Sequence, residues 1–298
     1  MTFQKLAVIG CGLMGGSFAL GLKQAGIVKN IAGFSASEKT RQRAQELQVI
    51  DVACDSVAQA VQGADIVLLA VPVSATRQSL EAIVPALSPN ALLMDVGSTK
   101  CDVVAAARET LGERLSCFVP AHPIAGKEVA GIEHAESDLY QNRRTILTPL
   151  PETGAKQMEQ AQAVWQALGS TVFTLTPEGH DATFAAVSHL PHLLAFAAVN
   201  GLMAQAQGED FLRMAGPGFR DFSRIAGSDP AVWRDILSAN QAEVLSQMGY
   251  FKQALTQLED ALKSQDTQAL QSLITKASQV RSHWKLQAKD ATNLASDA

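Results

Sequence analysis

Short apolar runs and helix-like segments alternate along the first 175 residues of the chain. The runs are rich in Val, Ile and Leu and are bounded by Gly, Pro or Asp, which is typical of buried strands in a parallel sheet. Segments between them, such as 37–48 and 99–111, have helical periodicity. The predicted strands are 5–9, 30–34, 65–71, 91–96, 117–121, 144–148 and 171–175. This alternation predicts a doubly wound α/β sheet.

The pattern changes after Thr176-Pro177, where no further strand-like run occurs. Long helical patterns cover 178–207, 210–226 and 230–288 instead. The sequence Ser228-Asp229-Pro230 is a helix start signal, with Pro at the first helical position. We therefore expect two domains, an α/β domain at 1–175 and an all-helical domain at 176–298.

One segment of the helical half, 182–208, contains no Asp, Glu, Lys or Arg. Its length would permit a membrane span. It also carries His189, Pro191, His192 and Asn200, and such polar groups are costly in lipid. Apolar residues recur on more than one face, so we expect a helix buried on all sides within a protein.

Composition and charge exclude several classes of protein. Of the 298 residues, 47% are apolar and 18% charged, and the net charge is −5. This is a soluble globular composition, and without a basic stripe we expect neither nucleic acid nor a membrane as partner. The four cysteines contain no CxxC pair, which fits a reducing cytoplasm. His189 and His192 have the spacing of metal ligands but lack a third one, so we expect no metal.

A glycine-rich loop follows the first predicted strand and opens a helix. Its pattern is Gly10-x-Gly12-x-x-Gly15. Such a loop makes a tight turn, lets the backbone approach a pyrophosphate and packs the helix on the strand, while free N–H groups of the helix face the phosphates. The alternative is a structural turn without ligand. The expected cofactor contacts here are Gly10, Gly12, Leu13, Met14, Gly15 and, at the end of the third predicted strand, Val71.

The end of the second predicted strand bears on cofactor choice. NAD enzymes usually place an acid there on the ribose hydroxyls, but this chain has Ser35. A hydroxyl can donate to a 2′-phosphate that a carboxylate would repel. With Ser37, Lys39 and Arg41 close by, we expect NADP to be preferred. NAD stays possible if the two cations are solvated helix residues.

Polar clusters end two later strands. Asp95-Val-Gly-Ser98-Thr-Lys100 follows one and Ala121-His122-Pro-Ile-Ala-Gly126 the next. Ligands of doubly wound sheets bind beyond the carboxyl ends of the strands, so both clusters point to the cofactor crevice. His122 is suited to proton transfer near neutral pH. The alternative is a hydrogen-bonded loop histidine.

Five segments together resemble one family. They are GCGLMGGS, DVGSTK, HPIAGKEVAG, SHLPH and FRDFSRIAGSDPAVWRDI. In this order, across about residues 5–250, the chain resembles the prephenate/arogenate (cyclohexadienyl) dehydrogenases of tyrosine biosynthesis. The resemblance implies oxidative decarboxylation of prephenate or arogenate, with hydride transfer to NAD(P), giving 4-hydroxyphenylpyruvate or tyrosine.

The resemblance also implies roles for single residues. His122 would be the general base, and Ser98 would hydrogen-bond both His122 and the substrate hydroxyl. Ser98 could instead cap the following helix. Arg224 would bind a substrate carboxylate through two parallel hydrogen bonds. Arg220, four residues earlier, would share its helix face, although a solvated surface arginine is an equal alternative.

Three further residues would line the substrate cleft by resemblance. They are His189, His192 and Trp233, each of which could instead be a core or interface residue. The family also implies a homodimer built through the helical domain.

Two other functions remain open on the residues alone. One is another two-domain NAD(P)-dependent hydroxyacid dehydrogenase or reductase; β-hydroxyacid enzymes of this kind use a lysine on the first long helix after the sheet, and 178–207 contains none. The other is a non-catalytic NADPH-sensing dimer, which would not need Ser98, His122 and Arg224 together.

Overall fold

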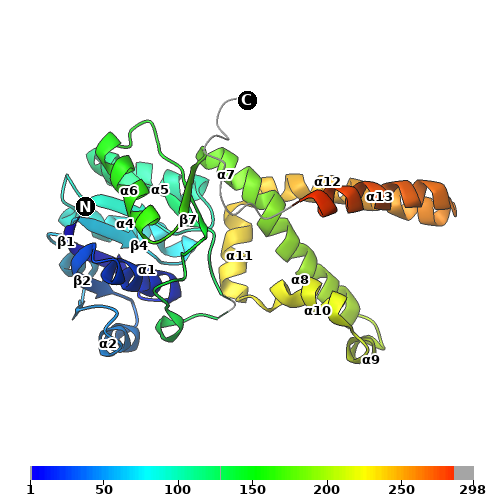
Figure 1. The fold of residues 1–298 in the computed structure, drawn as a ribbon, viewed down its shortest axis with the longest axis horizontal. Coiled ribbons are helices and arrows are strands. Elements are labelled where there is room, and N and C mark those ends of the chain that lie inside the picture. Colours follow the sequence, from blue (N-terminus) through cyan, green and yellow to red (C-terminus); the bar gives the residue numbers. More distant parts are fainter. Residues whose placement is uncertain (1, 128, 285–298) are drawn as a thin grey trace.

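The computed structural model describes residues 2–127 and 129–284, and these form an α/β unit beside a helical unit (Figure 1). The α/β unit contains a six-stranded parallel sheet in the order β3-β2-β1-β4-β5-β6. The strand order reverses between β1 and β4, which is where such sheets bind dinucleotides. The strands are β1 (Phe3–Ile9), β2 (Val28–Phe34), β3 (Val52–Ala53), β4 (Ile66–Leu69), β5 (Leu92–Asp95) and β6 (Phe118–Val119).

Helices cover both faces of this sheet because alternate side chains of each strand point to opposite faces. In β1, Leu6 and Val8 pack into one apolar cluster, whereas Ala7 and Ile9 pack into another. The first cluster is completed by α1 (Leu13–Gln24) and α6 (Ala155–Ala167). The second is completed by α3 (Val57–Val61), α4 (Thr76–Ile83) and α5 (Cys101–Leu111). The predicted doubly wound fold is confirmed.

A second, smaller sheet corrects the expectation that all seven runs belong to one parallel sheet. It has three strands in the order β7 (Ala121–Pro123), β8 (Arg144–Leu147) and β9 (Thr171–Thr174), and β7 pairs antiparallel with β8. The run 117–121 is divided at Pro120, which has no N–H to continue the first ladder. The carbonyl of Pro120 instead accepts from the N–H of Thr148, and the chain enters the second sheet.

The helical unit begins with one continuous helix, Pro177–Met203. It comprises α7 (Pro177–Phe184), a π-helical segment (Ala185–His189) and α8 (Leu190–Met203). The two other long patterns are interrupted. The first divides into α9 (Gly208–Arg213), α10 (Pro217–Ser223) and a 3₁₀ turn (Arg224–Gly227), and the second into α11 (Pro230–Ala239), α12 (Gln241–Lys263) and α13 (Thr267–His283). Residues 285–288 of the predicted pattern lie outside the described residues.

Local signals explain these interruptions. Pro217 stands at the start of α10, where its missing N–H costs nothing. Between α12 and α13, Gln265 has a φ of 56°, and the carboxylate of Asp266 accepts from the N–H of Ala269. That N-cap begins a new helix, so α12 and α13 form a hairpin that projects from the molecule (Figure 1).

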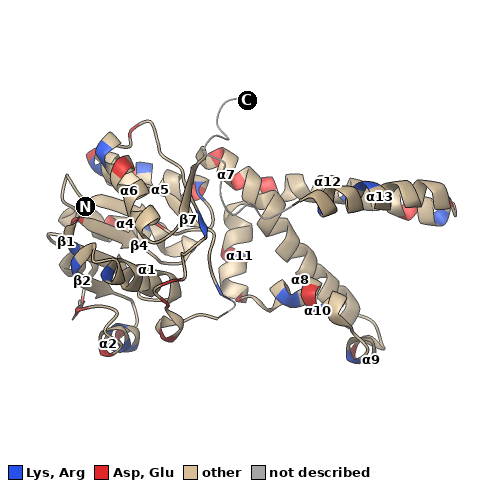
Figure 2. Cartoon of the chain, viewed as in Figure 1, with Lys and Arg blue, Asp and Glu red and all other residues tan. Residues whose placement is uncertain are grey.

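The apolar helix is less buried than expected. By length and composition 177–203 could cross a membrane, but only 28% of its most apolar window is buried within the chain. In α8 the buried residues are Leu190 and Ala195, and Figure 2 shows no charged residue along α8. Large apolar side chains are also exposed on α12, among them Leu245, Tyr250, Phe251, Leu255 and Leu262. The prediction of burial on all sides is therefore wrong for the single chain.

Candidate active site

The glycine loop is formed at the switch point of the large sheet. Gly10 has a φ of +103°, and a Cβ there would lie 2.2 Å from the carbonyl oxygen of Ala70. A Cβ on Gly15 would lie 2.1 Å from the carbonyl oxygen of Gly10. Both positions therefore need glycine, the first for its backbone conformation and both for close packing.

The middle glycine faces open space. A Cβ on Gly12 would meet no atom within 4 Å. Gly12 is the N-cap of α1, no side chain caps this helix, and Leu13 and Met14 form its first turn. Val71 borders the same loop, since its nitrogen lies 3.2 Å from a Cβ built on Gly10. The first N–H groups of a helix have no partner within the helix, so the start of α1 at Gly12, Leu13 and Met14 fits a pyrophosphate.

Arg41, one of the expected cations, lies close to the end of β2. The guanidinium of Arg41 donates to the carbonyl of Ser35 at 2.7 Å, lies 5.6 Å from the ring centre of Phe34, and approaches Asp55 at 3.5 Å. The hydroxyl of Ser37 is used locally, because it accepts from the N–H of Thr40 at the start of α2 (Glu38–Glu46). Lys39, in the same helix, is exposed.

A buried ion pair holds the backbone just before His122. Asp95 ends β5, and its carboxylate pairs with the ammonium of Lys100, whose side chain is completely buried. Asp95 also accepts from the N–H of Ala121 at 2.9 Å, while Lys100 donates to the carbonyl of Ala121 at 2.9 Å. Both polar groups of Ala121 are thus bound by one ion pair, which sets the position of the neighbouring His122.

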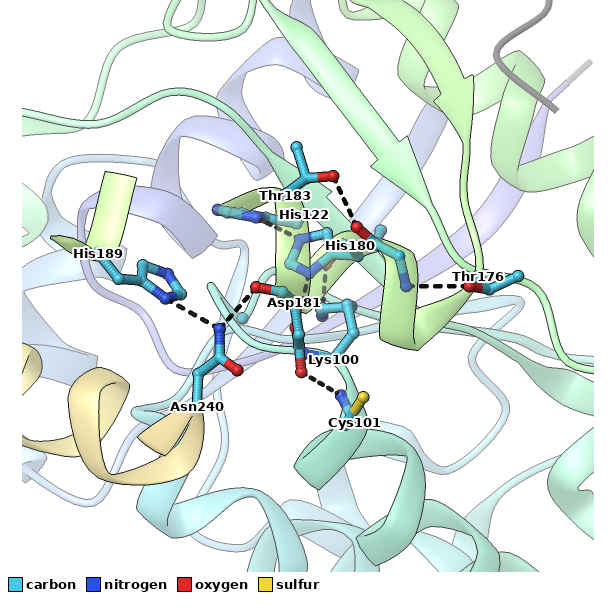
Figure 3. A network of polar contacts seen from close by, with 12 residues as sticks. Lys100, Cys101, His122, Thr176, His180, Asp181, Thr183, His189 and Asn240 are labelled. Carbon is cyan, nitrogen blue, oxygen red and sulfur yellow. Dashed lines mark hydrogen bonds and ion pairs between the residues drawn. The ribbon is translucent and has the colours of Figure 1, made fainter. Parts of the chain in front are cut away.

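His122 is hydrogen-bonded to a second histidine (Figure 3). Its Nδ1 lies 2.8 Å from Nε2 of His180, and Nδ1 of His180 lies 2.7 Å from the carboxylate of Asp181. Phe184 packs against both rings, with ring centres 4.9 Å from His122 and 4.5 Å from His180. His122 comes from β7 of the small sheet, whereas His180, Asp181 and Phe184 come from α7.

The carboxylate of Asp181 also binds the start of α5. It accepts from the N–H of Lys100 at 2.8 Å and from that of Cys101 at 2.9 Å. Burial by itself raises the pKa of Asp181, but the hydrogen bonds from His180, Cys101 and Lys100 outweigh it, and the pKa is lowered. Asp181 is therefore ionised and joins α7 to the nucleotide-binding unit.

Burial keeps the histidines of this cluster neutral. Desolvation lowers the pKa of His122 well below 6.5, and the positive charge of Lys100 adds to the effect. Desolvation also lowers the pKa of His180, although the Asp181 hydrogen bond opposes it. A neutral imidazole is the form that can accept a proton.

A third histidine is fixed separately. The amide nitrogen of Asn240 donates to the carbonyl of Asp181 at 2.8 Å and lies 3.1 Å from Nδ1 of His189. Burial lowers the pKa of His189 to about 4, against a backbone hydrogen bond with Ser98. The structure thus brings Ser98 and His189 together. No hydrogen bond of the Ser98 hydroxyl occurs within the described part of the chain, so its contact with His122 stays a prediction.

Ser98 does not cap the following helix. That helix, α5, begins at Cys101 with Lys100 as N-cap residue, and no side chain of its own loop caps it. The capping expectation is wrong because Asp181, from a helix 80 residues further along, supplies the acceptor.

His192, Trp233 and Arg224 lie together at the other end of the cluster. The rings of His192 and Trp233 stack, with centres 3.5 Å apart and planes at 20°. Burial lowers the pKa of His192, and the charge of Arg224 contributes to the shift. Arg220 is different: its side chain is 75% exposed and pairs with the adjacent Asp221. Arg224 begins a 3₁₀ turn, so the two arginines do not lie on one regular helix.

Sequence reasoning missed three residues of this network, His180, Asp181 and Asn240. It assigned Asp95 and Lys100 to a polar cluster at the crevice but not to an ion pair with each other. A signal for that pair did exist, because both are charges near the end of an apolar strand, and buried charges require partners. His180 and Asp181 stand at the start of a helix, where they look like ordinary polar residues.

Two family models match nearly the whole chain. Residues 18–174 match the nucleotide-binding domain of prephenate dehydrogenase, and residues 176–276 match the prephenate dehydrogenase dimerization domain. Among curated relatives, the cyclohexadienyl dehydrogenase of Zymomonas mobilis is 33% identical over 268 residues, which are 89% of this chain and 90% of that protein.

Solved structures agree with these matches. A prephenate dehydrogenase from Aquifex aeolicus, in complex with hydroxyphenyl propionate and NAD+, superposes with a TM-score of 0.88 at 34% identity, covering 95% of this chain and 98% of that one. The arogenate dehydrogenase of Synechocystis superposes with a TM-score of 0.80 at 30% identity, covering 94% and 99%.

Proposed function

The chain belongs to the prephenate dehydrogenase family, and from this premise we propose that it oxidatively decarboxylates prephenate, arogenate or both. The products are 4-hydroxyphenylpyruvate and tyrosine respectively. The observation that carries the proposal is a neutral, partly buried His122, held beside the end of β5 with one ring nitrogen hydrogen-bonded to His180.

The glycine loop would hold the cofactor. Gly12, Leu13 and Met14 offer backbone N–H groups to its pyrophosphate, and Gly10 and Gly15 keep the loop close to the sheet. Val71 lies just after β4 and next to this loop. When bound, a nicotinamide dinucleotide supplies the hydride acceptor of the reaction.

We place the preference with NADP and keep NAD as a possible cofactor. Ser35 stands where a carboxylate would repel a 2′-phosphate, and Arg41 binds the backbone of Ser35. The Arg41 charge and the exposed Lys39 would therefore lie near the ribose 2′ group of a bound dinucleotide.

Oxidation of the substrate ring needs one general base. The carbon that bears the 4-hydroxyl loses a hydride, and the hydroxyl proton passes to His122. The ring carboxylate leaves as carbon dioxide, and the electron pair of its broken C–C bond moves into the ring and makes it aromatic. The 4-oxygen becomes a phenolate, which takes the proton back from His122 to give the phenol. General-base catalysis of this kind contributes about 10²–10⁴-fold to rate.

The substrate carries two carboxylates, and the helical domain would supply the groups that bind them. Arg224 lies beside His192 and Trp233, and its guanidinium suits a bidentate carboxylate contact. His189 lies between this group and His122, because its ring contacts Trp233 and its Nδ1 faces Asn240, which binds Asp181. The backbone of Ser98 contacts His189. Arg220 has the weaker support, because it is exposed and paired with Asp221.

Assembly follows from the apolar surface of the helical domain. We propose a homodimer formed through the helical domain, 176–298. The poorly buried apolar helix 177–203 and the exposed apolar residues of α12 support this. The thiols of Cys11, Cys54, Cys101 and Cys117 are all free, which supports a reducing cytoplasm as location.

The test is a four-way assay. Purified protein receives prephenate or arogenate with NAD or NADP, and reduced nicotinamide is followed by its absorbance. Reduction in at least one pair is expected, and the best pair identifies substrate and cofactor. If all four pairs are inactive although NADPH binds, the dehydrogenase proposal is overturned, and a sensor or a hydroxyacid enzyme replaces it.

A further inference from the structure

We propose that His180 and Asp181 form a positioning relay that determines which nitrogen of His122 accepts the substrate proton. Asp181 sets the tautomer of His180, and His180 in turn sets the tautomer of His122. The inference rests on the proposed function for its catalytic meaning, but the tautomers themselves can be measured on the resting protein.

The relay begins at a carboxylate that can only accept hydrogen bonds. Asp181 is surrounded by the N–H groups of Lys100 and Cys101 and by Nδ1 of His180. Its pKa is lowered, so it carries no proton of its own. At 2.7 Å from such a carboxylate, Nδ1 of His180 must carry the proton.

The second step follows from the neutral state of His180. A neutral imidazole with its proton on Nδ1 has a lone pair on Nε2. That Nε2 lies 2.8 Å from Nδ1 of His122, so it accepts and His122 donates. Neutral His122 therefore has its proton on Nδ1, and its Nε2 is left with a lone pair.

The free nitrogen is where a base is needed. Within the described residues, Nε2 of His122 has no hydrogen-bond partner. This atom is not fully buried either. When it takes the hydroxyl proton, the new imidazolium still donates from Nδ1 to His180, and His180 still donates to Asp181. The charge formed on His122 is thus stabilised along two aligned hydrogen bonds.

Several charged or titratable groups face the two rings. They come from β5, the start of α5, α7 and the π-helical segment, and are Asp95, Lys100, Asp181 and His189. His189 is not part of the relay. Its Nδ1 faces the amide nitrogen of Asn240, and that amide donates to the backbone carbonyl of Asp181 and not to its carboxylate.

The first experiment reads the tautomers without turnover. Nitrogen-15 NMR of the full-length labelled protein is recorded near neutral pH, and the His122 signals are assigned by their loss in His122→Asn. We expect the proton of His122 on Nδ1 and an unprotonated Nε2. A proton on Nε2 of His122 in the resting protein would overturn the relay.

The second experiment reverses the relay from its far end. In Asp181→Asn the amide NH₂ can donate to Nδ1 of His180, which moves the His180 proton to Nε2 and the His122 proton to Nε2 as well. We expect kcat to fall by about 10²–10⁴-fold, by analogy with the wrong tautomer produced in a serine-protease triad. The KM for the cofactor should change little, since the glycine loop is not touched.

A rescue variant separates the tautomer effect from a structural one. In His180→Gln the amide oxygen can accept from Nδ1 of His122 whatever residue 181 is, so kcat should fall by only about tenfold. The double variant His180→Gln/Asp181→Asn should then resemble His180→Gln and exceed Asp181→Asn in kcat. Thr183→Ala is the matched control, because Thr183 is exposed on the same helix and its hydroxyl donates to the carbonyl of Gly179 in that helix.

The outcomes distinguish two failures. If the double variant is as inactive as Asp181→Asn or worse, Asp181 acts by capping α5, and the relay is wrong. If the wild-type protein turns over none of the four substrate and cofactor pairs, the proposed function fails, but the NMR measurement still decides the tautomers.

Discussion

At the scale of single residues, activity depends on a histidine that must be neutral to work. His122 lies among His180, Lys100 and Phe184, and burial disfavours its charged form. The same burial that would destabilise an imidazolium keeps the base available over a wider pH range.

The pH dependence of kcat/KM tests this. Because the pKa of His122 lies well below 6.5, protonation removes the base only at a lower pH. We expect kcat/KM to be maintained as the pH falls through 6.5 and to decline below it. In His122→Asn, turnover should fall by about 10²–10⁴-fold with cofactor affinity intact. An acid limb centred above 6.5, or unchanged turnover in His122→Asn, contradicts the assignment.

Cofactor choice is also decided by single side chains. A carboxylate introduced by Ser35→Asp would repel a 2′-phosphate and could accept from ribose hydroxyls. We expect the ratio of kcat/KM for NADP to that for NAD to fall by at least about tenfold, or about 1.4 kcal/mol. Ser56→Asp, at the start of α3, is the control for added charge. An unchanged ratio would place the discriminating contact elsewhere.

At the scale of elements, the site depends on how strand ends are joined. β5 and β7 belong to different sheets, and the Asp95–Lys100 pair links them by binding both polar groups of Ala121. A buried ion pair of this kind adds little net stability, but removing one partner leaves a buried charge. Its contribution is therefore to hold His122 at a defined place.

Lys100→Met tests the link between the strands. It leaves Asp95 buried without its cation, so we expect the free energy of unfolding to fall by about 3–5 kcal/mol in urea titration. The double variant Lys100→Met/Asp95→Asn should recover part of this loss, because the neutral amide can still accept from Ala121. Lys23→Met, which breaks an exposed ion pair with Asp51, should cost under about 1 kcal/mol. Equal losses in the two lysine variants would disprove the buried role.

At the scale of the whole molecule, the helical domain leaves more apolar surface exposed than a single chain should. The helix 177–203 is poorly buried, and the α12–α13 hairpin projects away from the rest of the chain (Figure 1). In the homodimer that we propose, the second chain covers the apolar helix surface that one chain leaves exposed.

Charges on the exposed face of α12 test the dimer. Phe251 and Leu255 are four residues apart and are 36% and 49% exposed. In Phe251→Glu/Leu255→Glu we expect sedimentation to show the mass of one chain, whereas the wild type shows twice that mass. Gln253→Glu/Gln257→Glu adds the same charge to the same helix at polar positions as a control. A double variant that still sediments as a dimer would exclude this face as the interface.

The sequence by itself determined the parts of this protein that contiguous residues encode. The spacing of Gly10, Gly12 and Gly15 predicts the phosphate loop because the turn and its close packing involve neighbouring residues. The alternation of apolar runs with helix-like segments predicts the sheet because each run is recognisable from contiguous residues. The resemblance of short segments located His122 and grouped it with Arg224, His192 and Trp233. Pro120 was visible too, but its consequence, a second sheet, depends on pairing with β8.

Only the tertiary structure decided which groups act on these residues. His122 and His180 are 58 positions apart, and Lys100 and Asp181 are 81 apart. No periodicity relates such positions, because they meet only when β7, α5 and α7 pack together. That packing determines the tautomer of His122, the cap of α5 and the binding of Ala121 by the Asp95–Lys100 pair. A buried polar group must find its partner wherever the fold brings one.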